Sequence, residues 1–129
     1  VIIDAGGRDS TALRAALILS DVLVIPFAPR SLDVWALHDI DSLVQEARAV
    51  RDGLRVVAML NNADPQGHDN EDAAAAVADF PSMEYVPTPI RRRKPIANAA
   101  GQGMSVLEYS PKDAKGIEEM TALVQAVFK

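Results

Sequence analysis

The sequence predicts a three-layer α/β fold, in which a mostly parallel sheet carries helices on both faces. Short apolar runs of strand length alternate with longer segments whose apolar residues recur at helical spacing. Of the 129 residues, 49% are hydrophobic but only 5% are aromatic, which favours an aliphatic core between helices and a sheet over a β-sandwich. This length suits one domain with a single core.

The first elements are a strand, a helix and a second strand. Val1–Ile3 is β-branched and leads to Asp4 and a glycine pair, which is typical of a buried strand that feeds a loop. A short helix is expected to begin at Ser10 or Thr11, either of which is able to cap it. Val22–Pro26 is apolar throughout, and this pattern predicts a parallel strand covered on both faces.

A long helix and a third strand follow. The helix is expected from Ser31 or Asp33 to about Arg51, because apolar residues recur at helical intervals and Gly53 suits its C-terminal stop. Leu54–Leu60 is the third strand, and the turn-forming pair Asn61-Asn62 is expected to end it.

The second half of the chain predicts two more helix-and-strand units. Its elements are a helix capped by Asn70 that continues to about Phe80, a strand over Met83–Val86, a helix near Ile96–Ala100, and a terminal helix from Ser110-Pro111 through Val127. In a parallel sheet, ligands lie beyond the carboxyl ends of the strands, so we expect the functional residues in the loops that follow them.

Composition excludes several classes of site. The chain has no Cys, which excludes disulfides, zinc–thiolate sites and iron–sulfur ligation, and fits a reducing, cytoplasmic location. Its apolar runs are too short to cross a bilayer. Thirteen Lys and Arg against eighteen Asp and Glu give a net charge of −5, so any affinity for nucleic acid requires a local basic patch.

A family resemblance emerges from the order of several motifs. VIIDAGG, SDVLVIPFAPRSLDVWAL, VVAMLNN, VPTPIRRR and AAGQGMSVLEYSPKDAKG follow one another along the chain, and this series resembles the deviant Walker ATPases of the ParA/MinD family, most closely the short plasmid-partition ParA proteins. The resemblance implies a P-loop NTPase-like fold. The glycine-rich GxxxxGK[ST] motif is missing from the sequence, so residues 1–129 are expected to be the C-terminal part of a single ParA-like domain that lacks its N-terminal strands.

The resemblance implies a nucleotide site that holds ATP and Mg²⁺. It places Asp4 on the magnesium shell and Gly6 or Gly7 near the γ-phosphate, where a glycine lets a backbone N–H approach closely. Asn61, with its neighbour Asn62, matches the base-reading position, since an amide both donates and accepts hydrogen bonds. From local sequence alone, Asp4 and the glycines fit a strand end and a tight turn equally well, and the Asn61-Asn62 pair fits a turn better than a base-reading site.

The same resemblance assigns the loop that follows the fourth predicted strand. Pro87, Thr88, Pro89 and Ile90 lie where the family packs backbone and apolar surface around adenine. As a pattern, this segment is equally consistent with a strand exit that contains two prolines.

One dense basic cluster is present. Arg91, Arg92, Arg93 and Lys94 are consecutive, and the resemblance puts them near the surface with which ParA dimers hold DNA without sequence preference. Lys112 and Lys115 would widen this patch if the fold brings them near. The alternative is a solvated turn in which one Arg has a structural role.

The resemblance implies that the chain is part of a partition ATPase, which couples ATP binding and hydrolysis to dimerisation and non-specific DNA binding in plasmid or chromosome segregation. The expected partners are a second copy in a homodimer, DNA, and a ParB-like or small centromere-binding protein, with no membrane and a nucleoid-associated location in the cytoplasm. The 129-residue piece alone is expected to be catalytically inactive, because the phosphate cradle supplies most of the grip on ATP. The alternative is a non-catalytic, P-loop-less interaction module with the same fold.

Overall fold

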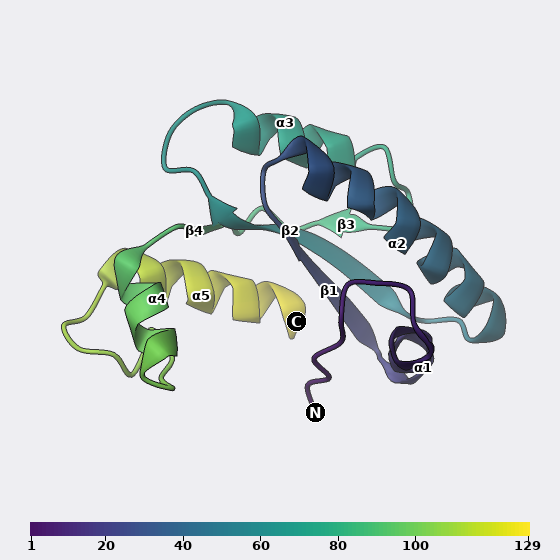
Figure 1. The fold of residues 1–129 in the computed structure, drawn as a ribbon, viewed down its shortest axis with the longest axis horizontal. Coiled ribbons are helices and arrows are strands. Elements are labelled where there is room, and N and C mark those ends of the chain that lie inside the picture. Colours follow the sequence, from purple (N-terminus) through teal and green to yellow (C-terminus); the bar gives the residue numbers. More distant parts are fainter.

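A computed structural model confirms the α/β fold class, with five helices and a parallel sheet (Figure 1). It describes the backbone of residues 1–129 and the side chains of residues 1–30 and 33–129. The elements in chain order are α1 (Thr11–Leu19), β1 (Val22–Phe27), α2 (Ser31–Val50), β2 (Arg55–Ala63), α3 (Asp69–Val77), β3 (Glu84–Tyr85), β4 (Ile90–Arg91), α4 (Lys94–Gly101) and α5 (Ala114–Val127).

The sheet is built around β2, and every strand pair is parallel. β1 pairs with β2 from Val22 opposite Arg55 to Phe27 opposite Leu60. The two short strands pair with successive stretches of β2: β3 at residues 57 and 58, and β4 at residues 61 and 63. The carboxyl ends of β2 and β4 therefore lie next to each other.

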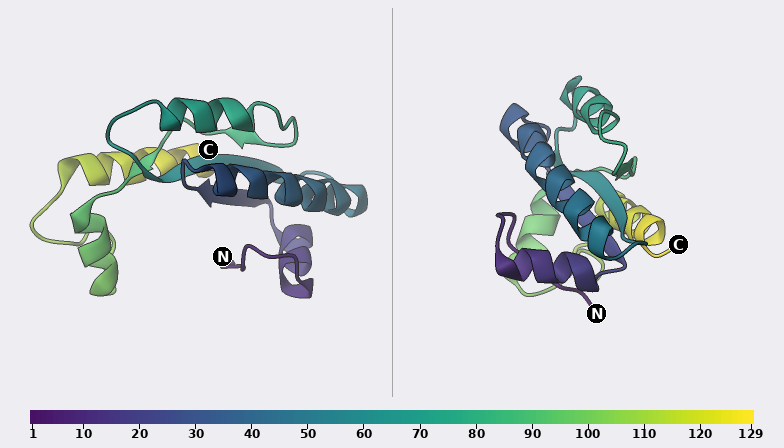
Figure 2. Two further views of the ribbon diagram at one scale, coloured as in Figure 1. Left: turned by 45° about the horizontal axis from the view of Figure 1, so that its top comes forward. Right: turned by 90° about the vertical axis from the view of Figure 1, so that its right-hand side faces the viewer.

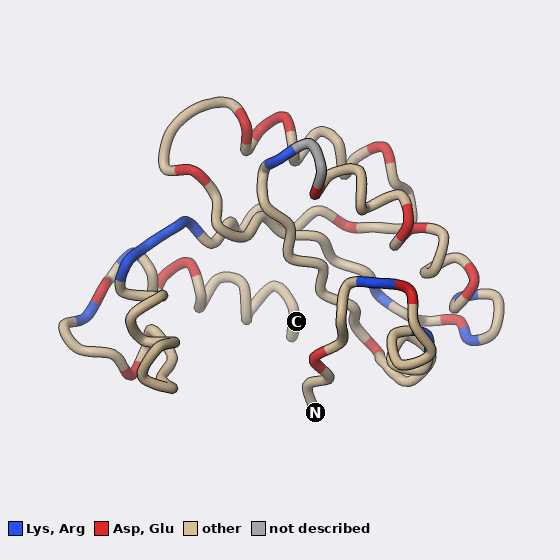
Figure 3. The backbone as a smooth tube through the Cα atoms, in the orientation of Figure 1, with Lys and Arg blue, Asp and Glu red and all other residues tan. Residues whose placement is uncertain are grey.

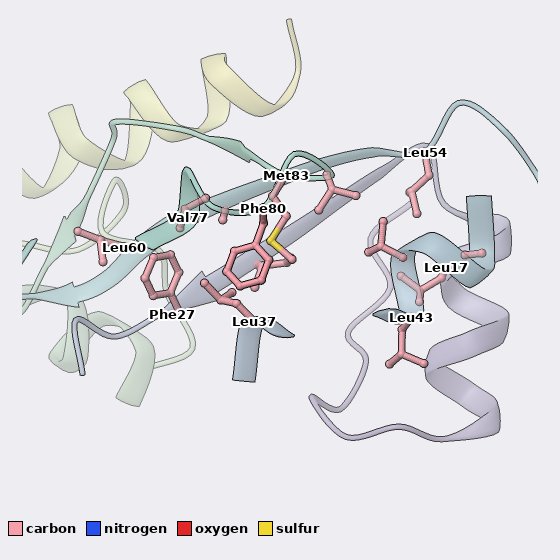
Figure 4. Packing of buried hydrophobic residues seen from close by; sticks show 14 of the residues in the cluster. Leu17, Phe27, Leu37, Leu43, Leu54, Leu60, Val77, Phe80 and Met83 are labelled. Carbon is pink, nitrogen blue, oxygen red and sulfur yellow. The ribbon is translucent and has the colours of Figure 1, made fainter. Parts of the chain in front are cut away.

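Side-chain alternation along β2 creates the three layers. Val56, Ala58 and Leu60 enter a core shared with α1, α2 and α3, whereas Val57 and Met59 belong to a second cluster beneath α5. Figure 2 shows α2 and α3 on one side of the sheet and α5 on the other. Figure 4 shows the first core, where the labelled side chains of the sheet and α2 meet those of α3 and the segment after it. Helices on both faces are therefore confirmed.

Arginine side chains fasten the helix ends to the rest of the fold. Arg51 donates to the carbonyl oxygens of Ile18 (2.7 Å) and Ser20 (3.0 Å) at the end of α1. Arg55 donates to the carbonyl oxygens of Ala126 (3.2 Å) and Val127 (3.1 Å) at the end of α5. The last carbonyl groups of a helix have no partner within it, so these guanidinium groups both satisfy them and hold the two helices in place.

The predicted strand at Val1–Ile3 is wrong for this structure. These residues have no regular secondary structure, and their exposed fractions are 125%, 87% and 49%. A strand requires a neighbour for its N–H and C=O groups, and within the described chain β1 pairs with β2 alone. The apolar pattern is present, but nothing in the described residues pairs with it.

The predicted end of the third strand is also wrong. β2 does not stop before Asn61-Asn62 but continues to Ala63, because β4, which the sequence pattern does not reveal, pairs with this extension. The predicted fourth strand is present but shorter, at residues 84–85.

The helix starts are confirmed in part. Ser10 caps α1 by accepting a hydrogen bond from the backbone N–H of Leu13 at 3.1 Å. Asn70 does not cap α3; it lies inside that helix and donates to the Asp64 carbonyl at 2.9 Å. Asp33 lies in the first turn of α2, and its carboxylate accepts from the N–H of Ala28 at 2.9 Å. The expected cap at Ser31 lies outside the described side chains.

The terminal helix begins later than predicted, at Ala114 rather than at Ser110-Pro111, whereas its end at Val127 is as predicted. The helix expected near residues 96–100 is present as α4. No helix of the described chain combines the length and apolar character that a membrane span needs.

Candidate functional site

The carboxyl end of β2 brings two of the predicted site segments together. Asn61 is in register with Ile90 of β4, although 28 residues of sequence lie between them. The pairing is irregular here, and Asn62 has a φ of 55°, a left-handed conformation that Asn tolerates better than most residues. Both Asn side chains are exposed. The amide groups of residues 61 and 62 and the 87–90 loop are therefore neighbours at one edge of the sheet.

The loop before β4 is partly fixed by its own backbone. The N–H of Thr88 donates to the carbonyl oxygen of Val86 at 2.8 Å, and Ile90 is buried beneath α5. Pro87 is exposed, and Pro89 is half-buried. Within the described residues, the buried hydroxyl of Thr88 has no hydrogen-bond partner. The loop thus offers a stiff, partly apolar surface, with the unpartnered Thr88 hydroxyl buried beneath it.

A cavity of about 310 Å³ lies between this loop and α3, and its lining includes Asp64, Asn70, Tyr85, Pro89 and Arg91. Asn70 uses its amide N–H for the Asp64 carbonyl, and its buried Oδ1 has no partner among the described side chains. Burial raises the pKa of Tyr85, so its phenol stays neutral at physiological pH. The cavity therefore combines neutral hydrogen-bonding groups, from Asn70 and Tyr85, with the charged side chains of Asp64 and Arg91.

The predicted phosphate and magnesium residues lie elsewhere. Asp4, Gly6 and Gly7 are exposed and belong to the N-terminal segment without regular structure. In Figures 1 and 2 this segment, drawn in purple, runs beside α1 and away from β4 and α4. In the described part of the chain, no three His, Cys, Asp or Glu side chains gather as a metal would require. The structure therefore brings together the two segments that were predicted to hold the base, but does not add Asp4, Gly6 and Gly7 to them.

The basic run follows directly after the loop and is continuous with β4 (Figure 3). Arg91 donates to Glu119 of α5 through its Nη1 at 2.9 Å and through its backbone N–H at 3.2 Å. Arg93 donates to the same carboxylate through Nη2 at 2.8 Å and Nε at 3.2 Å. Two of the four predicted DNA-binding residues therefore share one hydrogen-bonded carboxylate within the chain.

Glu119 is a residue that the sequence analysis did not single out. Its side chain is only 11% exposed. Burial by itself raises a carboxyl pKa, but the hydrogen bonds from Arg93 and Arg91 outweigh this effect and lower the pKa of Glu119 to about 2. No local pattern signals the contact, because its partners lie 26 and 28 residues away in sequence.

Comparison with known proteins gives one weak but extended similarity. No family model matches the chain. The chain is 23% identical over 129 residues to a protein named "Maintenance of carboxysome distribution protein A" from Halothiobacillus neapolitanus (strain ATCC 23641 / c2). The match covers 99% of this chain and 59% of that relative's length. The name of that relative concerns the distribution of carboxysomes.

Proposed function

We propose that this chain is part of an ATP-dependent positioning protein of the ParA/MinD type, which dimerises around ATP and Mg²⁺, binds DNA without sequence preference and releases it after hydrolysis stimulated by a partner. The main support for this proposal is the similarity, over 99% of the chain, to a protein whose name describes the distribution of carboxysomes. Because of that name, the proposed cargo is not restricted to the plasmid or chromosome that the motifs alone suggest.

In this proposal the edge formed by β2 and β4 supplies the base-side half of the nucleotide site. Asn61 reads one edge of adenine with its exposed amide, and Pro87–Ile90 supplies apolar surface and backbone groups beside it. The pairing of Asn61 with Ile90 supports this role, because it brings the last residues of β2 beside the segment that connects the carboxyl end of β3 to β4. The unpaired hydroxyl of Thr88 is a further group able to bond a ligand.

The phosphate half of the site requires groups that this sequence does not contain. Asp4 would organise Mg²⁺, which supplies charge stabilisation during phosphoryl transfer, and Gly6 or Gly7 would contact the γ-phosphate. A GxxxxGK[ST] loop would have to join them from another part of the protein, because its N–H groups and lysine hold the phosphates. The match to only 59% of the relative's length is consistent with such a part.

The first experiment is the intact mass of the expressed gene product, set against 13.8 kDa for these residues. A larger mass, with GxxxxGK[ST] in the added sequence, supports the proposal. ATP turnover is then measured with and without duplex DNA and with extracts that contain the cargo-binding partner. Stimulated turnover is expected. A P-loop-containing product that hydrolyses no ATP under any of these conditions would refute the enzyme and favour a binding module.

A residue-level test uses an ATP analogue with a fluorescent ribose substituent. Asn61→Asp exchanges an amide donor for an acceptor and is expected to weaken binding about tenfold, as loss of one buried hydrogen bond of roughly 1.4 kcal/mol would. Asn98→Asp is the matched control, because Asn98 is an exposed asparagine of α4 outside the proposed base site. Equal affinity of the Asn61 variant and the unmodified protein would remove the base-reading role.

A further inference from the structure

The four residues of the basic run form two pairs with different surroundings. Arg91 and Arg93 have exposed fractions of 39% and 21% and share the Glu119 carboxylate. The Arg92 side chain is 64% exposed, and its ion-pair contact, to Asp64, is long at 3.9 Å. Lys94 is also exposed. Arg91 and Arg93 are thus bonded to Glu119 within the fold, whereas Arg92 and Lys94 face outward.

The backbone conformation causes this division. Residues 90 and 91 form β4, the N–H of Arg92 donates to the Ala63 carbonyl at 3.1 Å, and Arg93 has φ −132° and ψ 132°. Successive side chains of an extended segment point to opposite sides. Since α5 covers the side on which Arg91 and Arg93 lie, the side chain of Arg92 between them is left outside. Lys94 begins α4 and is exposed there.

The same helix contributes one more outward cation. Lys115 is exposed and precedes Glu119 by four residues on α5, so the two lie on one face of that helix, a turn apart. Glu119 contacts the basic run directly, and the charge of Asp113 also acts on Arg93. This first part of α5 therefore runs beside the basic run.

We propose that Arg92, Lys94 and Lys115 form the surface that contacts DNA phosphates, and that Arg91 and Arg93 are positioning residues held by Glu119 and make no contact with DNA. This inference rests on the proposed DNA-binding function. Non-specific binding needs clustered mobile cations and no base-reading geometry. A guanidinium already bonded to a buried carboxylate would have to leave that partner unpaired before it could reach a phosphate.

The test measures the salt dependence of binding to a 24-base-pair mixed-sequence duplex, by fluorescence anisotropy of the full gene product with ATP and Mg²⁺. Each lost phosphate contact lowers the slope of log Kd against log salt by about 0.9 and weakens binding about fivefold at roughly 0.15 M salt. Arg92→Gln, Lys94→Gln and Lys115→Gln are each expected to show both effects.

Two variants provide the matched comparison. Arg91→Gln removes the same charge from the same run and is expected to leave the salt slope unchanged; it is the milder of the two inner substitutions, because Arg93 still holds Glu119. Lys129→Gln removes an exposed cation at the far end of α5 and is also expected to leave the slope unchanged. Circular dichroism confirms that each variant is folded.

The outcomes distinguish a wrong assignment of the phosphate-contacting residues from a failure of the DNA-binding function itself. If Arg91→Gln lowers the slope as much as Arg92→Gln does, the division of the basic run is wrong, while the DNA-binding function stands. If none of the three outward substitutions changes the slope, the surface lies elsewhere on the molecule. If the unmodified protein binds no duplex with or without ATP, the proposed function fails and this surface fails with it.

Discussion

Replacing Glu119 by Gln tests whether its ion pairs stabilise the fold. The pKa of Glu119 is lowered from its ordinary value of 4.5 to about 2, and each pKa unit corresponds to about 1.4 kcal/mol. The carboxylate therefore contributes at most roughly 3 kcal/mol to the free energy of unfolding at pH 7. Glutamine keeps one oxygen acceptor but loses the charge, so we expect Glu119→Gln to lower this free energy by about 2–3 kcal/mol.

The sign of the pH dependence follows from the direction of the shift. A carboxyl whose pKa is lower in the folded state adds stability above its unfolded pKa and loses it as the pH falls through its folded pKa. The difference between the unmodified chain and Glu119→Gln should stay nearly constant from pH 7 to pH 5. Between pH 5 and pH 3 it should shrink to under half of its value, because the unfolded chain then binds the proton that the folded chain still excludes.

Urea denaturation followed by circular dichroism at pH 7, 5 and 3 measures this difference. Glu118→Gln removes a neighbouring exposed carboxylate and is expected to change the unfolding free energy by less than about 0.5 kcal/mol. A loss below about 0.5 kcal/mol for Glu119→Gln at pH 7 would show that the bonds from Arg91 and Arg93 do not stabilise the fold. A difference that does not change between pH 5 and pH 3 would refute the lowered pKa.

Substitutions in three further parts of the fold are tested by the same denaturation assay. Leu37 is only 1% exposed, so Leu37→Ala should lower the free energy of unfolding by about 2–4 kcal/mol. Leu19 is 72% exposed, so Leu19→Ala should lower it by less than about 1 kcal/mol. Equal losses would contradict the described core. Arg55→Met keeps an apolar stem but removes the hydrogen bonds to the last carbonyl groups of α5. We therefore expect the free energy of unfolding to fall by about 1–2 kcal/mol and amide hydrogen exchange in α5 to become faster. Unchanged exchange would argue against this attachment of the helix. Asn62→Gly should be tolerated within about 0.5 kcal/mol, and Asn62→Val should cost about 1–2 kcal/mol, because a β-branched residue resists the left-handed φ of 55°; tolerance of Val would contradict that conformation.

The main elements of the fold could be predicted because their signals are local. The apolar run of β1 and the helical spacing in α2 each mark one element without reference to the rest of the chain. Ser10 identifies the start of α1 from a single side chain, because a serine hydroxyl competes well for the first free N–H groups of a helix.

The errors fall where the structure depends on distant partners. Val1–Ile3 has the composition of a strand, but composition does not provide a neighbour to pair with. Asn61-Asn62 has the composition of a turn, yet β2 continues through it because β4 supplies a partner there. β4 itself has only two residues, which is too short for any periodic pattern to detect. Both of these errors concern strand pairing between segments that are far apart in sequence.

The candidate site shows the same limit in more detail. The two segments proposed to hold the base could be recognised from sequence, and the register of Asn61 with Ile90 brings them together. The basic run could be recognised as a cluster, but not divided, because four consecutive cations look alike whichever way they point. Had β4 been recognised, the alternation of side chains in an extended segment would have separated Arg91 and Arg93 from their neighbours. Which pair faces inward would still have remained open, since that depends on Glu119, 26 residues beyond Arg93 on a helix whose position the strand pattern does not specify. An acidic partner at that distance converts a uniform charge pattern into an inner pair that holds the structure together and an outer pair available for binding.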